Sequence, residues 1–184
     1  MIYRFKLVSD EVNGFFRVID IDPSDTFFSL RKTILETAGY SDTNIDSFFI
    51  CSDKWEKHEE IALVDMGLTA SDHDLWTMDS TRINELVNNR GQKLVFTFDN
   101  LNDRSFFIEL KEVVTGEKVD KPEVIQQHGK APKQDMGLDG LLDGIKEEDP
   151  KAGQVSSDIF GENADGYSDE DLYGLNPFDE SNYN

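Results

Sequence analysis

Between Lys93 and Leu110 the chain reads KLVFTFDNLNDRSFFIEL, two apolar-alternating runs on either side of a polar turn. Successive side chains of a strand point to opposite faces of a sheet, so this alternation predicts two half-buried strands. The short polar segment between the two runs predicts that they form an antiparallel hairpin. We therefore expect Phe98 and Ile108 on the buried face of adjacent strands, and Arg104 near the turn at a position that tolerates alanine.

The N-terminal third has a second hairpin pattern, followed by a helix and a strand. Apolar and polar residues alternate over residues 2–8 and 15–21. The polar segment between them ends in Asn-Gly, a dipeptide that tolerates positive φ. Apolar residues recur at helical spacing over residues 27–38, with Ser, Asp and Thr before them as capping residues. Gly39 stands where a left-handed C-terminal cap belongs. Residues 47–51, SFFIC, predict the next strand.

The remaining patterns are weaker. Short strands are expected at residues 60–64, 75–78 and 122–125, and a short helix at residues 83–87. The fold class is therefore α+β, with a mostly antiparallel or mixed sheet packed on helix 27–38. The ββαβ start, together with DPSDT at residues 22–26, is similar to the start of ubiquitin and favours a β-grasp-like architecture. An unrelated α+β sandwich of sheet and helix is the alternative.

Charge and composition divide the chain into two parts, a domain over residues 1–138 and a tail over residues 139–184. The formal net charge is −20, and the tail has thirteen acidic and two basic residues, a net of −11. The tail cannot bury enough apolar area to offset its ordering entropy, so we expect it to be disordered alone. Its scattered apolar residues predict a motif that docks on a partner with a basic surface. These candidate partner-binding residues are Phe160, Tyr167, Leu172, Tyr173 and Phe178.

The same numbers restrict location and partners. No apolar run is long enough to span a membrane, the N-terminus lacks a signal-peptide pattern, and the single cysteine cannot form an internal disulfide. We expect a cytoplasmic protein in which Cys51 is buried. So acidic a chain repels phosphate, which disfavours direct binding to nucleic acid.

No motif of a known chemistry is evident. The histidines, His58, His73 and His128, are scattered and lack metal-ligand spacing, so no metal site is predicted. Glycine-rich phosphate loops and nucleophile elbows are absent, and no cofactor is expected. The sequence alone leaves enzymatic activity open, although it favours a protein without one.

The hairpin and a later segment resemble the signature of the plasmid pRiA4b ORF-3-like family, also called the IS1096 element passenger TnpR family. That signature runs aromatic-x-aromatic-Asp-Phe-Gly-Asp-x-Trp-x-His-x-Ile, with Ala-Pro-Pro-Glu-Asp-x-Gly further along. The matching positions in this chain are Phe96, Phe98, Asp99, Ile108, Ala131, Pro132, Asp135 and Gly137. The resemblance implies an association with plasmids or mobile elements in bacteria, but no defined reaction.

The chain departs from this signature at its Trp and His positions, which hold Arg104 and Phe106. An Asp–His pair in the hairpin is therefore lost, and with it the side chain that titrates near neutral pH. The serine recombinase chemistry implied by the TnpR label is not favoured, since no basic DNA-binding helix is present. Our leading hypothesis is a non-enzymatic protein-interaction module. The alternatives are an enzyme that uses the Asp99, His128 and Asp135 neighbourhood, and an acidic nucleic-acid mimic that binds a basic protein.

Overall fold

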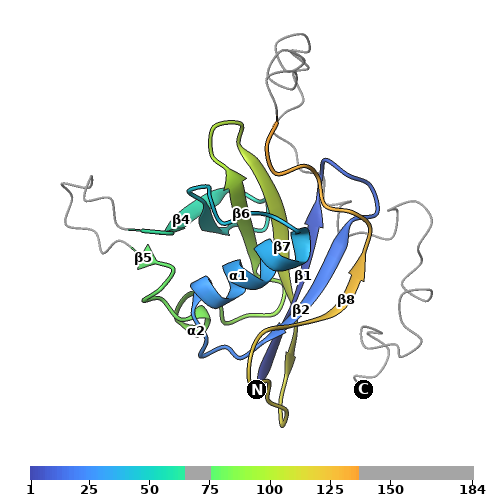
Figure 1. Cartoon of the computed structure of the whole chain (residues 1–184). Coiled ribbons are helices and arrows are strands. Elements are labelled where there is room, and N and C mark those ends of the chain that lie inside the picture. Colours follow the sequence, from blue (N-terminus) through green and yellow to red (C-terminus); the bar gives the residue numbers. More distant parts are fainter. Residues whose placement is uncertain (65–75, 137–184) are drawn as a thin grey trace, which may run out of the picture.

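The alternating segments of the sequence pair into one eight-stranded sheet. The computed structural model describes residues 1–64 and 76–136 (Figure 1). The strands are β1 (Ile2–Ser9), β2 (Phe16–Ile21), β3 (Ser47–Cys51), β4 (Lys57–Ala62), β5 (Trp76–Thr77), β6 (Lys93–Asp99), β7 (Arg104–Val114) and β8 (Glu123–His128). The helices are α1 (Phe27–Ala38) and the single turn α2 (Ile83–Leu86).

Spatial order in the sheet is β5-β4-β3-β6-β7-β1-β2-β8. Only β4 and β5 pair in parallel; the other neighbours are antiparallel, so the sheet is mixed, as expected. The chain therefore begins with the predicted order of hairpin, helix and strand. The second neighbour of β1 is β7, which runs antiparallel to it. The β-grasp part of the expectation stays a prediction.

Local chemistry explains both ends of α1. The Thr26 side chain accepts a hydrogen bond from the backbone N–H of Ser29, which satisfies one of the free donors of the first turn. Gly39 takes the left-handed conformation (φ 72°), and its N–H donates to backbone carbonyls of the last turn. The capping residues and the terminal glycine of the sequence prediction are thus confirmed.

The helix α1 lies across one face of the sheet, which holds the larger hydrophobic core (Figure 1). Phe27 of the helix packs on Phe48 of β3 with ring centroids 5.4 Å apart, and Phe48 packs on Phe96 of β6 at 4.7 Å. Phe98 and Ile108 are both buried in this core. The predicted placement of Phe98 and Ile108 on the buried face of adjacent strands is therefore confirmed.

No helix among the described residues covers the opposite face of the sheet. A smaller apolar cluster lies there, made of Val8, Cys51, Trp55, Val95 and Phe107, with Phe16 and Phe49 packed against it. The free thiol of Cys51 belongs to this cluster and is buried, as expected from the sequence. The two faces of the sheet therefore differ. The helix α1 covers the larger apolar core on one face, whereas side chains of the strands and of Trp55 cover the smaller cluster on the other.

Element boundaries differ from the predictions mainly in the weak patterns. β4 begins at Lys57 rather than Glu60, because Cys51 of β3 pairs with Lys57 across an irregularity in the register. β8 continues to His128, because its last residues pair with β2. The tail, residues 139–184, and the signature residue Gly137 lie outside the described residues. No helix in the described part of the chain is long and apolar enough to cross a membrane.

Candidate functional site

The acidic residue of the hairpin signature, Asp99, organises the β6–β7 turn. Its Oδ1 accepts hydrogen bonds from the backbone N–H groups of Leu101 (3.1 Å) and Asn102 (3.3 Å). Its Oδ2 accepts another from the Asn102 side-chain amide at 2.7 Å. This is the local side-chain-to-backbone bonding that makes Asp favourable in turns. Both carboxylate oxygens of Asp99 are thus engaged within its own turn.

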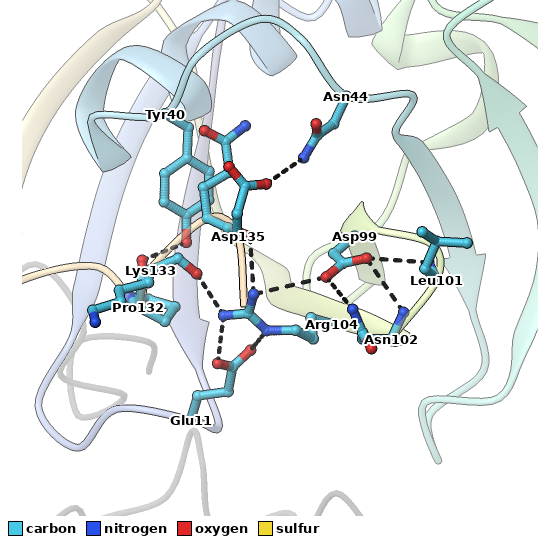
Figure 2. Close-up of polar contacts among 11 residues, drawn as sticks. Glu11, Tyr40, Asn44, Asp99, Leu101, Asn102, Arg104, Pro132, Lys133 and Asp135 are labelled. Carbon is cyan, nitrogen blue, oxygen red and sulfur yellow. Dashed lines mark hydrogen bonds and ion pairs between the residues drawn. The ribbon is translucent and has the colours of Figure 1, made fainter. Parts of the chain in front are cut away.

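Arg104, the first residue of β7, is the centre of the polar cluster (Figure 2). Its side chain donates to both carboxylate oxygens of Glu11, from Nε at 3.0 Å and from Nη2 at 2.8 Å. It also forms an ion pair with Asp99 at 3.8 Å and lies over the ring of Phe98. The residue is only 8% exposed. Arg104 lies next to the turn, as expected, but its guanidinium is buried and bonded to several partners, so the contacts do not support the expected tolerance of alanine.

The same guanidinium fastens the chain that follows β8. Residues 131–136, here called the strap, carry two backbone carbonyls that accept from Arg104: that of Lys133 at 2.6 Å and that of Gln134 at 2.9 Å. The Tyr40 hydroxyl donates to the carbonyl of Pro132 at 2.8 Å. The Gln134 side chain accepts from the backbone N–H of Ser41 and donates to its carbonyl. The strap is therefore held between the loop after α1 and the end of the hairpin.

Electrostatics keep this cluster charged. Burial alone would lower the pKa of the Arg104 guanidinium, but the hydrogen bonds and charge of Glu11 outweigh it and hold the pKa above its ordinary value. Burial raises the pKa of the Tyr40 hydroxyl well above its usual range. Tyr40 therefore stays a neutral donor at physiological pH. The cluster is a fixed cation–anion pair with neutral donors and carbonyls around it.

The aromatic signature positions serve the core. Phe106, at the signature's His position, is fully buried. It packs against Phe98 at 4.8 Å, Phe15 at 5.3 Å and Tyr40 at 5.7 Å between ring centroids. Phe96, Phe98 and Ile108 lie in the same core, and Ala131 is partly buried against it. The interpretation of the hairpin as a packing scaffold agrees with these contacts.

The three residues of the enzyme hypothesis are not gathered at one place. Asp135 of the strap accepts a hydrogen bond from the Asn44 side chain at 3.4 Å, near Asp99 and Arg104 (Figure 2). His128 instead ends β8, where its ring stacks on Phe16 at 5.8 Å. Three strands separate β8 from β6, which at about 4.8 Å per strand puts His128 roughly 19 Å from the Asp99 strand. Within the described residues, no group of His, Cys, Asp and Glu side chains could hold a metal ion.

Sequence reasoning found the signature residues but not their partners. Glu11 lies in the predicted turn between the first two strands and Tyr40 directly follows the Gly39 cap, 93 and 64 residues away from Arg104. Neither pattern indicated a contact with Arg104. One signal was available, since an arginine stood among aromatic residues at a position where the signature has a Trp. The tail positions proposed for partner binding, and Gly137, fall outside the described residues.

The observed architecture defines an α+β protein with one eight-stranded mixed sheet, whose polar signature residues join a hairpin turn to a C-terminal strap. The sequence model of the plasmid pRiA4b ORF-3-like protein family matches residues 2–167, and the chain belongs to that family. A crystal structure of a protein of unknown function from Methanosarcina mazei Go1 is similar in fold. It has a TM-score of 0.58 and 19% sequence identity, and the match covers 79% of this chain and 82% of that one. No curated protein matches this chain significantly.

Proposed function

We propose that this protein is a non-enzymatic protein-interaction module. The observation that carries the proposal is the engagement of the polar signature groups, since Arg104 bonds to Glu11 and to the strap, and Asp99 bonds within its own turn. A catalytic pair needs side chains within hydrogen-bonding reach of one another and of a reacting atom. The signature groups instead build a scaffold, and such a scaffold supports recognition by a surface.

The recognition element in this proposal is the acidic tail, residues 139–184. Its net charge of −11 complements a partner with a basic surface. Phe160, Tyr167, Leu172, Tyr173 and Phe178 supply apolar anchors, the residue types that contribute most to interface energies when they are buried in a partner's pocket. A cytoplasmic location and an association with plasmids or mobile elements are part of the same proposal.

An acidic nucleic-acid mimic is the second candidate, supported by the net charge of −20. A mimic would bind a DNA-binding protein through regularly spaced carboxylates, and its binding would fall steeply with salt. Anchoring by aromatic residues would be less sensitive to salt, because burial of apolar surface does not depend on counterions. The two candidates therefore differ in how partner binding responds to ionic strength.

The test is affinity capture from native lysate with the full chain and a matched variant. The variant has serine at Phe160, Tyr167, Leu172, Tyr173 and Phe178, which removes the apolar anchors and retains every charge. L101A is the control, because Leu101 is 96% exposed in the hairpin turn and outside the tail. We expect a specific partner with the full chain and with L101A, and its loss with the serine variant. Retention of the partner by the serine variant, with loss only at high salt, would favour the mimic.

A further inference from the structure

The Asn13-Gly14 dipeptide lies at the centre of the turn between β1 and β2, in which the N–H of Phe15 donates to the carbonyl of Val12 at 3.5 Å. It is the sole Asn-Gly pair in the sequence. Both residues are exposed, and Gly14 has a positive φ of 74°. No hydrogen bond to another described residue holds the Asn13 side chain. Its amide is therefore open to solvent and to the backbone that follows it.

An asparagine followed by glycine can react with its own backbone. The amide nitrogen of Gly14 attacks Cγ of Asn13, because glycine has no Cβ to crowd the approach and its backbone is conformationally free. The N–Cγ bond forms, the Cγ–Nδ2 bond breaks, and ammonia leaves with the proton of the Gly14 amide. Water then opens the cyclic succinimide. Attack of water at Cγ gives aspartate, whereas attack at the main-chain carbonyl carbon gives isoaspartate, whose main chain is longer by a methylene.

The same loop makes two contacts with the C-terminal part of the described chain. Glu11 binds the guanidinium of Arg104, which fastens the strap (Figure 2). Gly14 lies against Gly129, the residue directly after β8, and a Cβ on Gly129 would be 2.9 Å from the Gly14 carbonyl oxygen. The two backbones are therefore already in close contact. A longer main chain at residue 13 has to move the loop relative to at least one of these contacts.

We propose that Asn13 is a site of spontaneous deamidation, and that isoaspartate at this position releases the strap from Arg104. The lengthened turn does not retain both the close approach of Gly14 to Gly129 and the two-pronged geometry of Glu11 on Arg104. Without that geometry the guanidinium is no longer oriented toward the strap carbonyls. The reaction consumes only water and needs no partner, so it does not depend on the proposed interaction function.

The first part of the test is incubation of the folded full chain in mildly alkaline buffer, followed by peptide mapping with mass spectrometry. Chromatography separates the aspartate and isoaspartate peptides, and an isoaspartyl methyltransferase labels the latter. Asn89 is the internal control, because it is also exposed but is followed by Arg90, whose side chain hinders the attack. We expect conversion at Asn13 to be at least fivefold faster than at Asn89. Equal rates would overturn the proposal, as would conversion of Asn13 only in the urea-unfolded chain.

The second part is brief digestion of the aged protein with trypsin, which cleaves after lysine. Lys133 lies in the strap and its carbonyl is bonded to Arg104, whereas Lys118 lies in the exposed loop between β7 and β8 and is the reference site. We expect isoaspartate at residue 13 to be at least threefold enriched in chains cut at Lys133 over chains cut at Lys118. Equal isoaspartate contents would overturn the proposal.

Two controls separate the longer main chain from other effects of ageing. Aspartate at residue 13 has the same charge as isoaspartate and an unchanged backbone, so we expect no enrichment of the aspartate form at Lys133. Equal enrichment of both forms would overturn the proposal, because charge alone would then open the strap. N13Q has an amide on a longer side chain that forms the cyclic imide far more slowly. A rise in Lys133 cleavage in aged N13Q as large as in the parent chain would also overturn it.

Discussion

Arg104 on β7 and Glu11 in the β1–β2 loop form a two-pronged ion pair, with Nε–Oε1 at 3.0 Å and Nη2–Oε2 at 2.8 Å. The two residues are 93 positions apart in the sequence. Two parallel hydrogen bonds of this kind fix the orientation of the planar guanidinium. The remaining donors of Arg104 then point at the carbonyls of Lys133 and Gln134, so the pair sets where the strap can lie.

Replacement of Arg104 by alanine should destabilise the protein by about 2–4 kcal/mol. The substitution leaves the Glu11 carboxylate and two strap carbonyls without their donor, and loss of one partner of a buried ion pair costs about 3–5 kcal/mol. The lower range applies here because Glu11 is partly exposed. Urea unfolding of the full chain measures the effect. A change below about 0.5 kcal/mol would show that the cluster contributes little.

The charge-removing variant E11Q separates the ion pair from the strap contacts. It retains an oxygen that can accept from Arg104 but loses the two-pronged geometry. We expect E11Q to destabilise the protein less than R104A. The double variant should cost less than the sum of the two single changes, because residues in direct contact couple. If the free-energy changes of the two single variants simply add up in the double variant, the two side chains do not interact.

Replacement of either Phe98 or Ile108 by alanine should lower the free energy of unfolding by about 2–5 kcal/mol, because truncation of a buried side chain leaves a cavity. Both are only 1% exposed in the core under α1. L101A in the same hairpin turn is the control and should stay within about 0.5 kcal/mol. Thermal or urea unfolding of the three variants gives the comparison. A large effect of L101A with a small effect of F98A would mean that the register of the hairpin is wrong.

Alkaline pH should weaken the fold through Cys51. Burial raises the pKa of its thiol from 9.0 to about 11. The folded state thus binds the proton more tightly than the unfolded state, so this stabilisation is complete below about pH 9 and is lost as pH rises to about 11. Two pKa units correspond to about 2.7 kcal/mol at most. Stability measured from pH 8 to 11 under reducing conditions should fall less steeply in C51A than in the parent chain.

Duplex DNA should not bind detectably at about 150 mM salt, where typical non-specific binders have dissociation constants of roughly 10⁻⁴–10⁻⁶ M. Arg4 pairs with Asp20 and Glu112 on the face of the sheet opposite α1, whereas the guanidinium of Arg17 is directed at α1 and bonds to the Thr37 side chain. These two arginines therefore do not join one basic surface. A mobility-shift titration with the full chain checks this expectation. Binding in the micromolar range would contradict the interaction-module proposal.

Patterns of period two and period 3.6 were sufficient to predict the strands that carry the core. Residues 93–99 and 47–51 were placed correctly, because short runs rich in aromatic and aliphatic residues between turn segments favour strands. The end of α1 was also predictable, since Gly39 adopts a conformation that disfavours other residues. The family signature could also be recognised from the sequence, because most of its residues are close to one another along the chain.

Long-range partners were decided only by the tertiary structure. Arg31 of α1 is only 1% exposed, and it bonds to Asp42 and Asp46 from the loop after the helix. Arg104 looked like a turn residue until Glu11 and the strap were placed around it. A charged residue can be buried only where partners from distant segments satisfy it, and local sequence does not encode those partners. The sequence thus determined which segments form strands and the helix, whereas packing of distant segments determined which charges became structural.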